Sequence, residues 1–138
     1  MWTNWEEFLP EHVYASQGRL FVIDPKGKDM VLGLPQIDLA MFSVLCSDVY
    51  KLPSGEKGEI ILKNLSDKIS VQQGLSQRDA GILWLLGRAM QYSLSSRFRI
   101  DKELERAVEY GSKSASVILE LERILFSTMP ENIKNLQR

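Results

Sequence analysis

The sequence holds a single histidine, His12, and a single cysteine, Cys46, in 138 residues. The common zinc sites combine several Cys, His and carboxylate ligands, and a disulfide needs two cysteines. Neither residue has a second histidine or cysteine near it in the sequence, so no nucleophile–base pair is visible. We therefore expect no metal site, no bound cofactor and no catalytic residue of the Cys/His type.

The acidic pairs and the glycines also lack the surroundings that catalysis requires. Glu6-Glu7 and the pair Glu103 and Glu105 lie outside the apolar runs that would raise a carboxyl pKa for acid–base work. The segment Gly55–Gly58 does not have the Gly-x-x-x-x-Gly-Lys-Ser/Thr spacing of a phosphate-binding loop. The sequence therefore predicts a protein that is not an enzyme.

The charges are balanced, because 17 Lys and Arg against 18 Asp and Glu leave a net charge of −1. Proteins bind phosphate backbones through a basic excess on some surface, so this balance argues against a general affinity for nucleic acid. A net charge near zero also produces little repulsion between copies of the chain. Association with another protein is therefore not opposed electrostatically.

Length and composition predict one domain over residues 1–138, since 44% of the residues are apolar and 25% are charged. The chain has no apolar run of roughly 18 residues, so we expect no membrane span. Asn4, Glu6 and Glu7 stand where a secretory signal would have basic or apolar residues. A lone cysteine is typical of a reducing compartment, which predicts a cytoplasmic location.

The clearest local pattern lies in the N-terminal third. Two strand-like runs, Arg19–Ile23 and Met30–Leu34, flank the segment Asp24–Lys28. Asp, Pro and Gly within that segment are typical of a type I turn, so the pattern predicts a β-hairpin. Val13–Ala15 is a candidate third short strand.

Helical periodicity covers most of the remaining sequence. It predicts four helices, near 36–52, 59–73, 77–95 and 101–126. Ile60–Leu62 also has the composition of a strand, but Gly74 stands where a helix places its left-handed cap, which favours a helix over 59–73. Ser76 is the expected N-cap of the third helix.

The third helix has the most apolar stretch of the chain, Ala80–Leu86, which includes Trp84. We therefore expect it to be central and Trp84 to be buried. The last helix has one long apolar stripe, made of Leu104, Ala107, Val108, Gly111, Ala115, Ile118, Leu121 and Leu125. Together these elements predict an α+β fold in which the N-terminal hairpin packs on about four helices.

Three early aromatic residues, Trp2, Trp5 and Phe8, would share one side of a short helix from about Asn4 to Leu9. They have two interpretations: the edge of the core, or an interface, since Trp is enriched where proteins bind one another. The hairpin edge has few charges to protect it from pairing with another chain. The candidate interface residues are therefore Trp2, Trp5, Phe8, Leu20, Phe21 and Val31. We expect a small non-enzymatic protein that acts through protein–protein contacts, as a regulator, adaptor, inhibitor or subunit, with another protein or a second copy as its partner.

One segment offers an alternative function. Leu75–Arg78, followed by Ile82-Leu83 and Leu85-Leu86, resembles the opening helix of the LuxR-type helix-turn-helix. The resemblance covers about a dozen residues, after which the helical pattern continues and no matching recognition helix follows. It implies a DNA-binding transcriptional regulator, and the candidate nucleic-acid contacts are Arg78, Arg97, Arg99 and Lys102.

Overall fold

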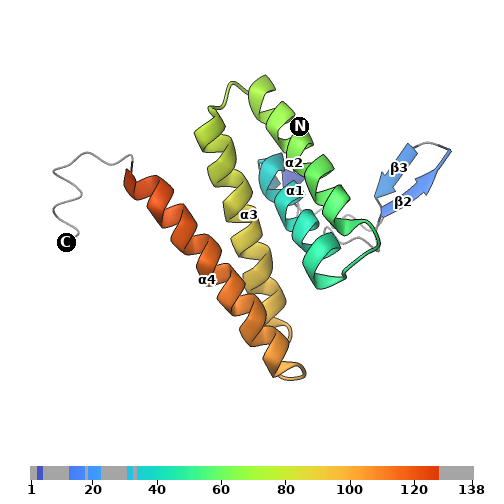
Figure 1. Cartoon of the computed structure of the whole chain (residues 1–138). Helices are drawn as coiled ribbons and strands as arrows, with labels where there is room; N and C mark the ends of the chain where they lie inside the picture. The colour runs from blue at the N-terminus through green and yellow to red at the C-terminus, as the bar shows by residue number, and fades with distance from the viewer. Residues whose placement is uncertain (1–2, 5–12, 18, 23–30, 33, 128–138) are drawn as a thin grey trace.

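The computed structural model describes residues 3–4, 13–17, 19–22, 31–32 and 34–127 of the chain. In this part of the chain the architecture is helical (Figure 1). The helices are α1 (Pro35–Val44), α2 (Gly55–Gln72), α3 (Gln77–Arg97) and α4 (Leu104–Ser127), and a π-helical turn, η3 (Leu45–Val49), follows α1 directly.

The predicted α+β fold was wrong, because the helices alone build the described core. The described strands form two short antiparallel pairs and not a sheet layer. They are β1 (Thr3–Asn4) with β4 (Val31–Leu32), and β2 (Val13–Ser16) with β3 (Arg19–Val22). Pairs of two to four residues bury too little apolar surface to form a layer of a domain.

The predicted hairpin partner was also wrong. Arg19–Val22 pairs with Val13–Ser16, so that Ser16 lies opposite Arg19 and Val13 opposite Val22. The short connection through Gln17, which has a positive φ of 50°, closes this hairpin. A two-residue connection costs less chain entropy than the longer one through Asp24–Lys28, which explains the preference. Thr3 and Asn4 belong to a strand rather than to the start of a helix, and the remainder of the helix expected near 4–9 lies outside the described residues.

The local helix signals were read correctly. The central helix is confirmed as α3, and Ser76 caps it by accepting a hydrogen bond from the Asp79 backbone N–H at 3.1 Å. The segment near 59–73 is a helix, α2, and Gly74 after it has a φ of +74°. The glycine supplies the left-handed conformation that ends many helices. The last helix, α4, is confirmed within a few residues of the expected bounds.

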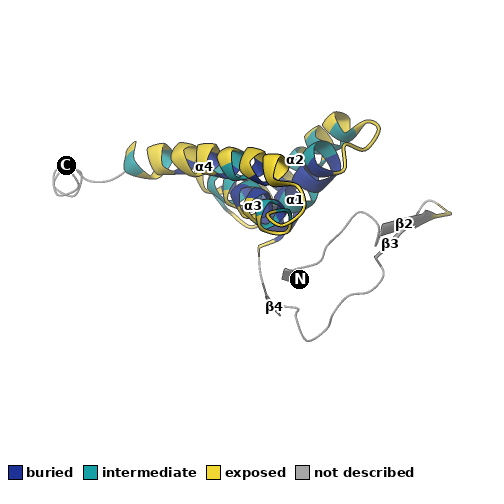
Figure 2. Ribbon diagram, turned by 90° about the horizontal axis from the view of Figure 1, so that it is seen from below, coloured by how far each residue is buried: buried dark blue, intermediate teal, exposed yellow. Residues whose placement is uncertain are grey.

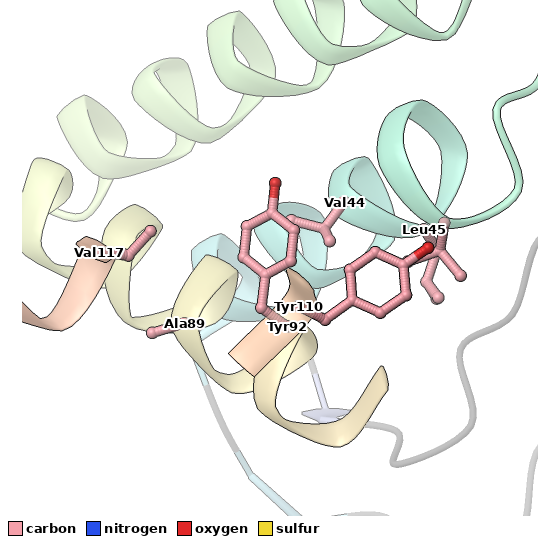
Figure 3. Packing of buried hydrophobic residues seen from close by; sticks show 7 residues of the cluster. Val44, Leu45, Ala89, Tyr92, Tyr110 and Val117 are labelled. Carbon is pink, nitrogen blue, oxygen red and sulfur yellow. The ribbon is translucent and has the colours of Figure 1, made fainter. Parts of the chain in front are cut away.

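The larger hydrophobic cluster joins α1 and η3 to α3 and α4. Tyr92 of α3 and Tyr110 of α4 lie at its centre, with ring centroids 6.4 Å apart (Figure 3). The members of this cluster are Val44, Leu45, Val49, Ala89, Tyr92, Tyr110 and Val117. They place α3 between η3 and α4, so α3 is the central helix of the described part of the chain.

A second cluster confirms the predicted burial of Trp84, whose side chain is 4% exposed. Trp84 packs against Leu39 and Ala40 of α1, with Leu62 and Ile69 of α2 beside them. Figure 2 shows buried residues concentrated where α1, α2 and α3 meet, whereas much of α4 is exposed. One large aromatic side chain therefore joins three helices.

The close contact between α1 and α3 depends on Gly87. A Cβ atom at this position would lie 2.5 Å from the carbonyl oxygen of Ile37 and 2.7 Å from the Cβ of Ala40. The backbones of the two helices therefore approach each other more closely than any side chain at 87 would permit.

Candidate functional site

Helix α4 has two apolar rows side by side, and only one of them is covered. Successive residues turn by about 100° around a helix, so residues three or four apart share a face. The covered row packs toward α3 and consists of Ala107, Tyr110, Ser114, Val117 and Leu121. The second row is exposed and consists of Leu104, Val108, Ala115, Ile118 and Leu125, with Leu119 beside it. The single stripe expected from the sequence is thus split between the core and the surface.

The exposed row is strongly accessible rather than partly shielded. Leu104 is 64% exposed, Val108 61% and Ile118 52%. Most charged and hydroxyl side chains of α4 lie on a third face, formed by Glu105, Arg106, Glu109, Ser112, Ser116, Glu120 and Arg123, whereas Glu122 lies within the exposed row. Because most polar residues have a face of their own, the exposed row is a separate and largely apolar surface.

Helix α3 extends this surface with Leu86 and Met90, which are 38% and 40% exposed. The two helices run antiparallel, since Ser96 donates to the Ala107 carbonyl and Ser114 donates to the Ala89 carbonyl. The exposed residues Leu86, Met90, Val108, Ala115 and Ile118 each follow by one residue a position that packs between α3 and α4, namely Leu85, Ala89, Ala107, Ser114 and Val117. One residue further along the chain lies about 100° around the helix. Because α3 and α4 run in opposite directions, this rotation places the exposed residues of both helices on the same side of the pair.

We call this surface the outer face and define it as Leu86 and Met90 of α3 with Leu104, Val108, Ala115, Ile118, Leu119 and Leu125 of α4. Figure 1 shows α4 lying closest to α3 near the turn that joins them and extending away at its carboxyl end. The outer face therefore runs the length of a helix that is supported from one side only.

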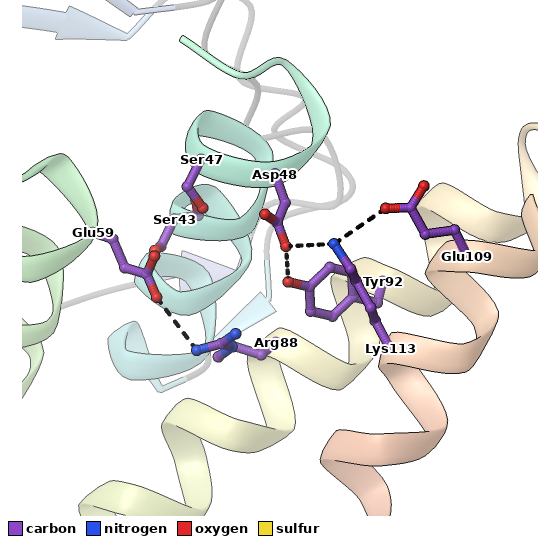
Figure 4. A network of polar contacts seen from close by, with 8 residues as sticks. All are labelled: Ser43, Ser47, Asp48, Glu59, Arg88, Tyr92, Glu109 and Lys113. Atoms are coloured by element: carbon purple, nitrogen blue, oxygen red, sulfur yellow. Dashed lines mark hydrogen bonds and ion pairs between the residues drawn. The ribbon is translucent and has the colours of Figure 1, made fainter. Parts of the chain in front are cut away.

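The opposite side of the α3–α4 pair carries a charged network (Figure 4). The Asp48 carboxylate accepts hydrogen bonds from the Tyr92 hydroxyl and, at 3.3 Å, from the Lys113 ammonium. Lys113 also pairs with Glu109 at 3.3 Å. Beside them Arg88 of α3 pairs with Glu59 of α2, also at 3.3 Å. Side chains from η3 and all three long helices thus meet in one network.

The π-helical turn η3 orients Asp48 in this network. The Tyr50 backbone N–H donates to the Leu45 carbonyl at 2.8 Å, five residues back, which widens the turn. Ser47 donates its hydroxyl hydrogen to the Ser43 carbonyl at 2.9 Å. The α-helix expected over 36–52 therefore ends at Val44, and its continuation aims a carboxylate at α3 and α4.

The pKa values of both donors in the network are raised. Burial raises the pKa of the Tyr92 phenol, and the hydrogen bond to Asp48 raises it further. Burial lowers the pKa of Lys113, but the charge of Asp48 and the hydrogen bond to Glu109 outweigh it, so the pKa is above its usual value. Both groups keep their protons and act as donors to carboxylates. Neither is activated as a base or nucleophile.

We expect the Tyr92→Phe substitution to lower the free energy of unfolding by about 1.5 kcal/mol, the low end for a hydrogen bond to a charged group, since Asp48 keeps Lys113. The pKa of the Tyr92 phenol is higher in the folded protein than in the unfolded chain, where it is about 10. The protonated phenol therefore stabilises the fold fully at pH values below about 10, and this stabilisation is lost as the pH rises through the folded pKa. Urea unfolding at pH 8 and pH 11 should therefore show a smaller loss of stability in the variant than in the wild type. Equal losses in the two proteins would contradict this role for Tyr92.

The structure does not gather the residues predicted from the sequence into one site. Trp2, Trp5 and Phe8 lie outside the described residues. Leu20 and Phe21 lie in β3 and Val31 in β4, where only the backbone is described. The interface expected in the N-terminal third remains a prediction.

The four candidate nucleic-acid contacts are divided between the two ends of α3. Arg78 lies at its first turn beside Asp79, whereas Arg97, Arg99 and Lys102 lie at or just after its last turn. Arg99 also pairs with Glu103 at 3.2 Å and lies over the ring of Tyr110. Because α3 runs unbroken from Gln77 to Arg97, the turn of a helix-turn-helix is absent from this segment.

Other kinds of site find little support in the described part of the chain. No cluster of three or more His, Cys, Asp or Glu residues there could hold a metal ion. A hollow near the carboxyl end of α4 is lined, among described residues, by Leu119, Glu122, Arg123 and Phe126. These residues come from one helix, so they do not provide the converging polar groups of a small-molecule site. Among the described residues, no helix combines the length and hydropathy needed to cross a membrane.

Comparison with known protein families gives no match, and comparisons with curated proteins and with solved structures give none either. The outer face is the feature that the sequence reasoning missed, although the spacing that defines it was visible in the apolar positions of α4.

Proposed function

We propose that this protein is a non-enzymatic binding protein that contacts another protein chain through the outer face. The observation that carries the proposal is the exposure of an apolar row along most of α4, next to a row that is fully packed. Contiguous apolar surfaces of this kind mark interaction sites in soluble proteins. An apolar helix face whose anchors are spaced by three and four residues is also a recurring recognition surface.

The energetics support association. Full burial of a leucine, isoleucine or valine side chain contributes roughly 1.5–3 kcal/mol. The outer face offers several such side chains on a rigid helix, so little conformational entropy is lost when they are covered. The charged network on the opposite side fixes α4 relative to η3 and α3, and thereby presents these side chains in a set geometry.

A cytoplasmic location is part of the proposal. It is supported by Cys46, the single cysteine of the sequence, which is buried in η3. Burial raises the pKa of its thiol, so the reactive thiolate is disfavoured. A structural cysteine of this type is compatible with a reducing compartment.

The test compares two acidic substitutions on different faces of α4. Ile118→Asp places a charge in the outer face, whereas Ser116→Asp adds the same charge to the polar face as a matched control. We expect gel filtration of native lysates to show the wild type and Ser116→Asp in a complex, and Ile118→Asp at the size of the 15.8 kDa monomer. Elution of all three proteins as monomers would contradict the proposal, as would a complex that Ile118→Asp leaves intact.

A further inference from the structure

We propose that the occupant of the outer face is a second copy of this chain, with the two α4 helices packed antiparallel. This inference rests on the proposed function and names its partner. The exposed positions 104, 108, 115, 118 and 125, together with the half-buried Gly111 and the exposed Glu122, follow alternating steps of four and three residues. This is the seam of a two-helix coiled coil, which calls for a helix of matching length and spacing as its partner.

The order of small and large side chains along the seam allows two copies of α4 to pack against each other. Gly111 and Ala115 are small and lie near the middle of α4, whereas Val108 and Ile118 flank them. An antiparallel pair centred on position 113 places Gly111 opposite Ala115 of the second copy and Val108 opposite its Ile118. The small residues allow the helix axes to approach, and the large residues pack on both sides of that contact.

The charges at the two ends of the seam favour the antiparallel direction. Near the carboxyl end of α4, Glu122 lies in the seam itself, whereas Glu120 and Arg123 lie on the polar face. The other end lies beside the α3–α4 turn, where Arg97 and Lys102 are exposed together with Asp101 and Glu103. An antiparallel pair brings Glu122 of one copy to the turn of the other, which carries Arg97 and Lys102, whereas a parallel pair would place Glu122 against Glu122 of the second copy.

The first test uses charge at the centre of the seam. Ala115 is exposed, so Ala115→Glu and Ala115→Lys are compatible with the folded monomer, which far-ultraviolet circular dichroism would check. Light scattering of the purified wild type should give twice the monomer mass of 15.8 kDa. Each variant alone should give the monomer mass, because like charges meet across the two-fold axis. An equimolar mixture of the two variants should restore the dimer mass.

Ser116→Glu and Ser116→Lys are the matched controls, since Ser116 lies on the polar face, and both should remain dimeric. A wild type that remains monomeric at about 100 μM, well above physiological binding constants for stable dimers, would overturn the inference. So would Ala115 variants that stay dimeric on their own.

The second test determines the direction of the helices. In the antiparallel pair Val108→Cys of one copy lies opposite Ile118→Cys of the other, within reach of a disulfide. A mixture of these two variants should therefore cross-link on oxidation. Val108→Cys alone should not, because its two cysteines would lie about 15 Å apart along the helix axis. Cross-linking of Val108→Cys alone would contradict the antiparallel arrangement.

The failures of the two proposals are distinguishable. If the purified protein is monomeric but Ile118→Asp still releases it from a complex in lysate, the partner is a different protein; the second-copy inference then fails and the proposed function stands. If neither experiment shows association, both fail.

Discussion

Replacement of Trp84 by alanine is expected to lower the free energy of unfolding by about 3–5 kcal/mol, the range for a large aromatic residue removed from a packed core. Trp84 is 4% exposed and fills the space between α1, α2 and α3. The substitution removes its contacts with Leu39 and Ala40 and leaves a cavity that three helices would have to close together. Such a cavity closes incompletely, because each helix is held by other contacts.

The measurement is a urea titration followed by far-ultraviolet circular dichroism, which reports the helices directly. Trp84→Phe is the matched control, since it keeps an aromatic ring in the same place and should lose clearly less stability than the alanine variant. An unchanged denaturation midpoint for Trp84→Ala would contradict both the burial of this residue and the central position of α3.

The second large effect is expected from a substitution that adds one methyl group. Alanine at position 87 would place its Cβ 2.5 Å from the Ile37 carbonyl oxygen, an atom of the α1 backbone that has no flexible side chain to move aside. Overpacking of this kind costs typically about 1–3 kcal/mol, and contact with backbone places Gly87→Ala near the upper end. This cost outweighs the gain in helix propensity of about 1 kcal/mol for glycine to alanine.

Gly81 of the same helix provides the control, because a Cβ at Gly81 would meet no atom within 4 Å. Gly81→Ala should therefore be neutral or stabilise the protein by up to about 1 kcal/mol. The two variants make the same chemical change six positions apart, so their difference in thermal midpoint isolates the α1–α3 contact. Equal midpoints would show that the two helices are not packed as closely as the structure indicates.

Local signals in the sequence were sufficient to predict where the helices near the middle of the chain begin and end. Ser76 and Gly74 mark the start of α3 and the end of α2 because a side-chain cap and a left-handed glycine act within one turn of the residues they terminate. Trp84 was placed correctly in the core because apolar residues surround it on all sides of its helix.

Strand pairing and the charged network depend on contacts between distant segments. The turn pattern in Asp24–Lys28 favoured Met30–Leu34 as the partner of Arg19–Val22, whereas the structure pairs this run with Val13–Ser16. Asp48 is 44 positions from Tyr92 and 65 from Lys113, so no spacing in the sequence signals that they meet. These contacts become visible only when η3, α3 and α4 are placed in space.

The outer face could not be predicted from helical periodicity alone. The apolar positions of α4 were identified correctly, but they span a wider arc than one neighbouring helix can cover. Periodicity shows which residues share a face and does not show which face is covered. The position of α3 decides this, because it covers Tyr110 and Leu121 and leaves Val108 and Ile118 exposed.

The central claim is that the outer face contacts another protein chain, and photo-cross-linking from single positions tests it most directly. A benzophenone amino acid placed at Val108 or Ile118 reports the outer face, and the same group at Ser112 or Ser116 reports the polar face of the same helix. Irradiation of cells that make these variants, followed by mass spectrometry of the adducts, identifies what lies against each position. We predict discrete protein adducts from Val108 and Ile118 and none from Ser112 and Ser116. Absence of adducts at all four positions, or equal adducts from both faces, would contradict the claim.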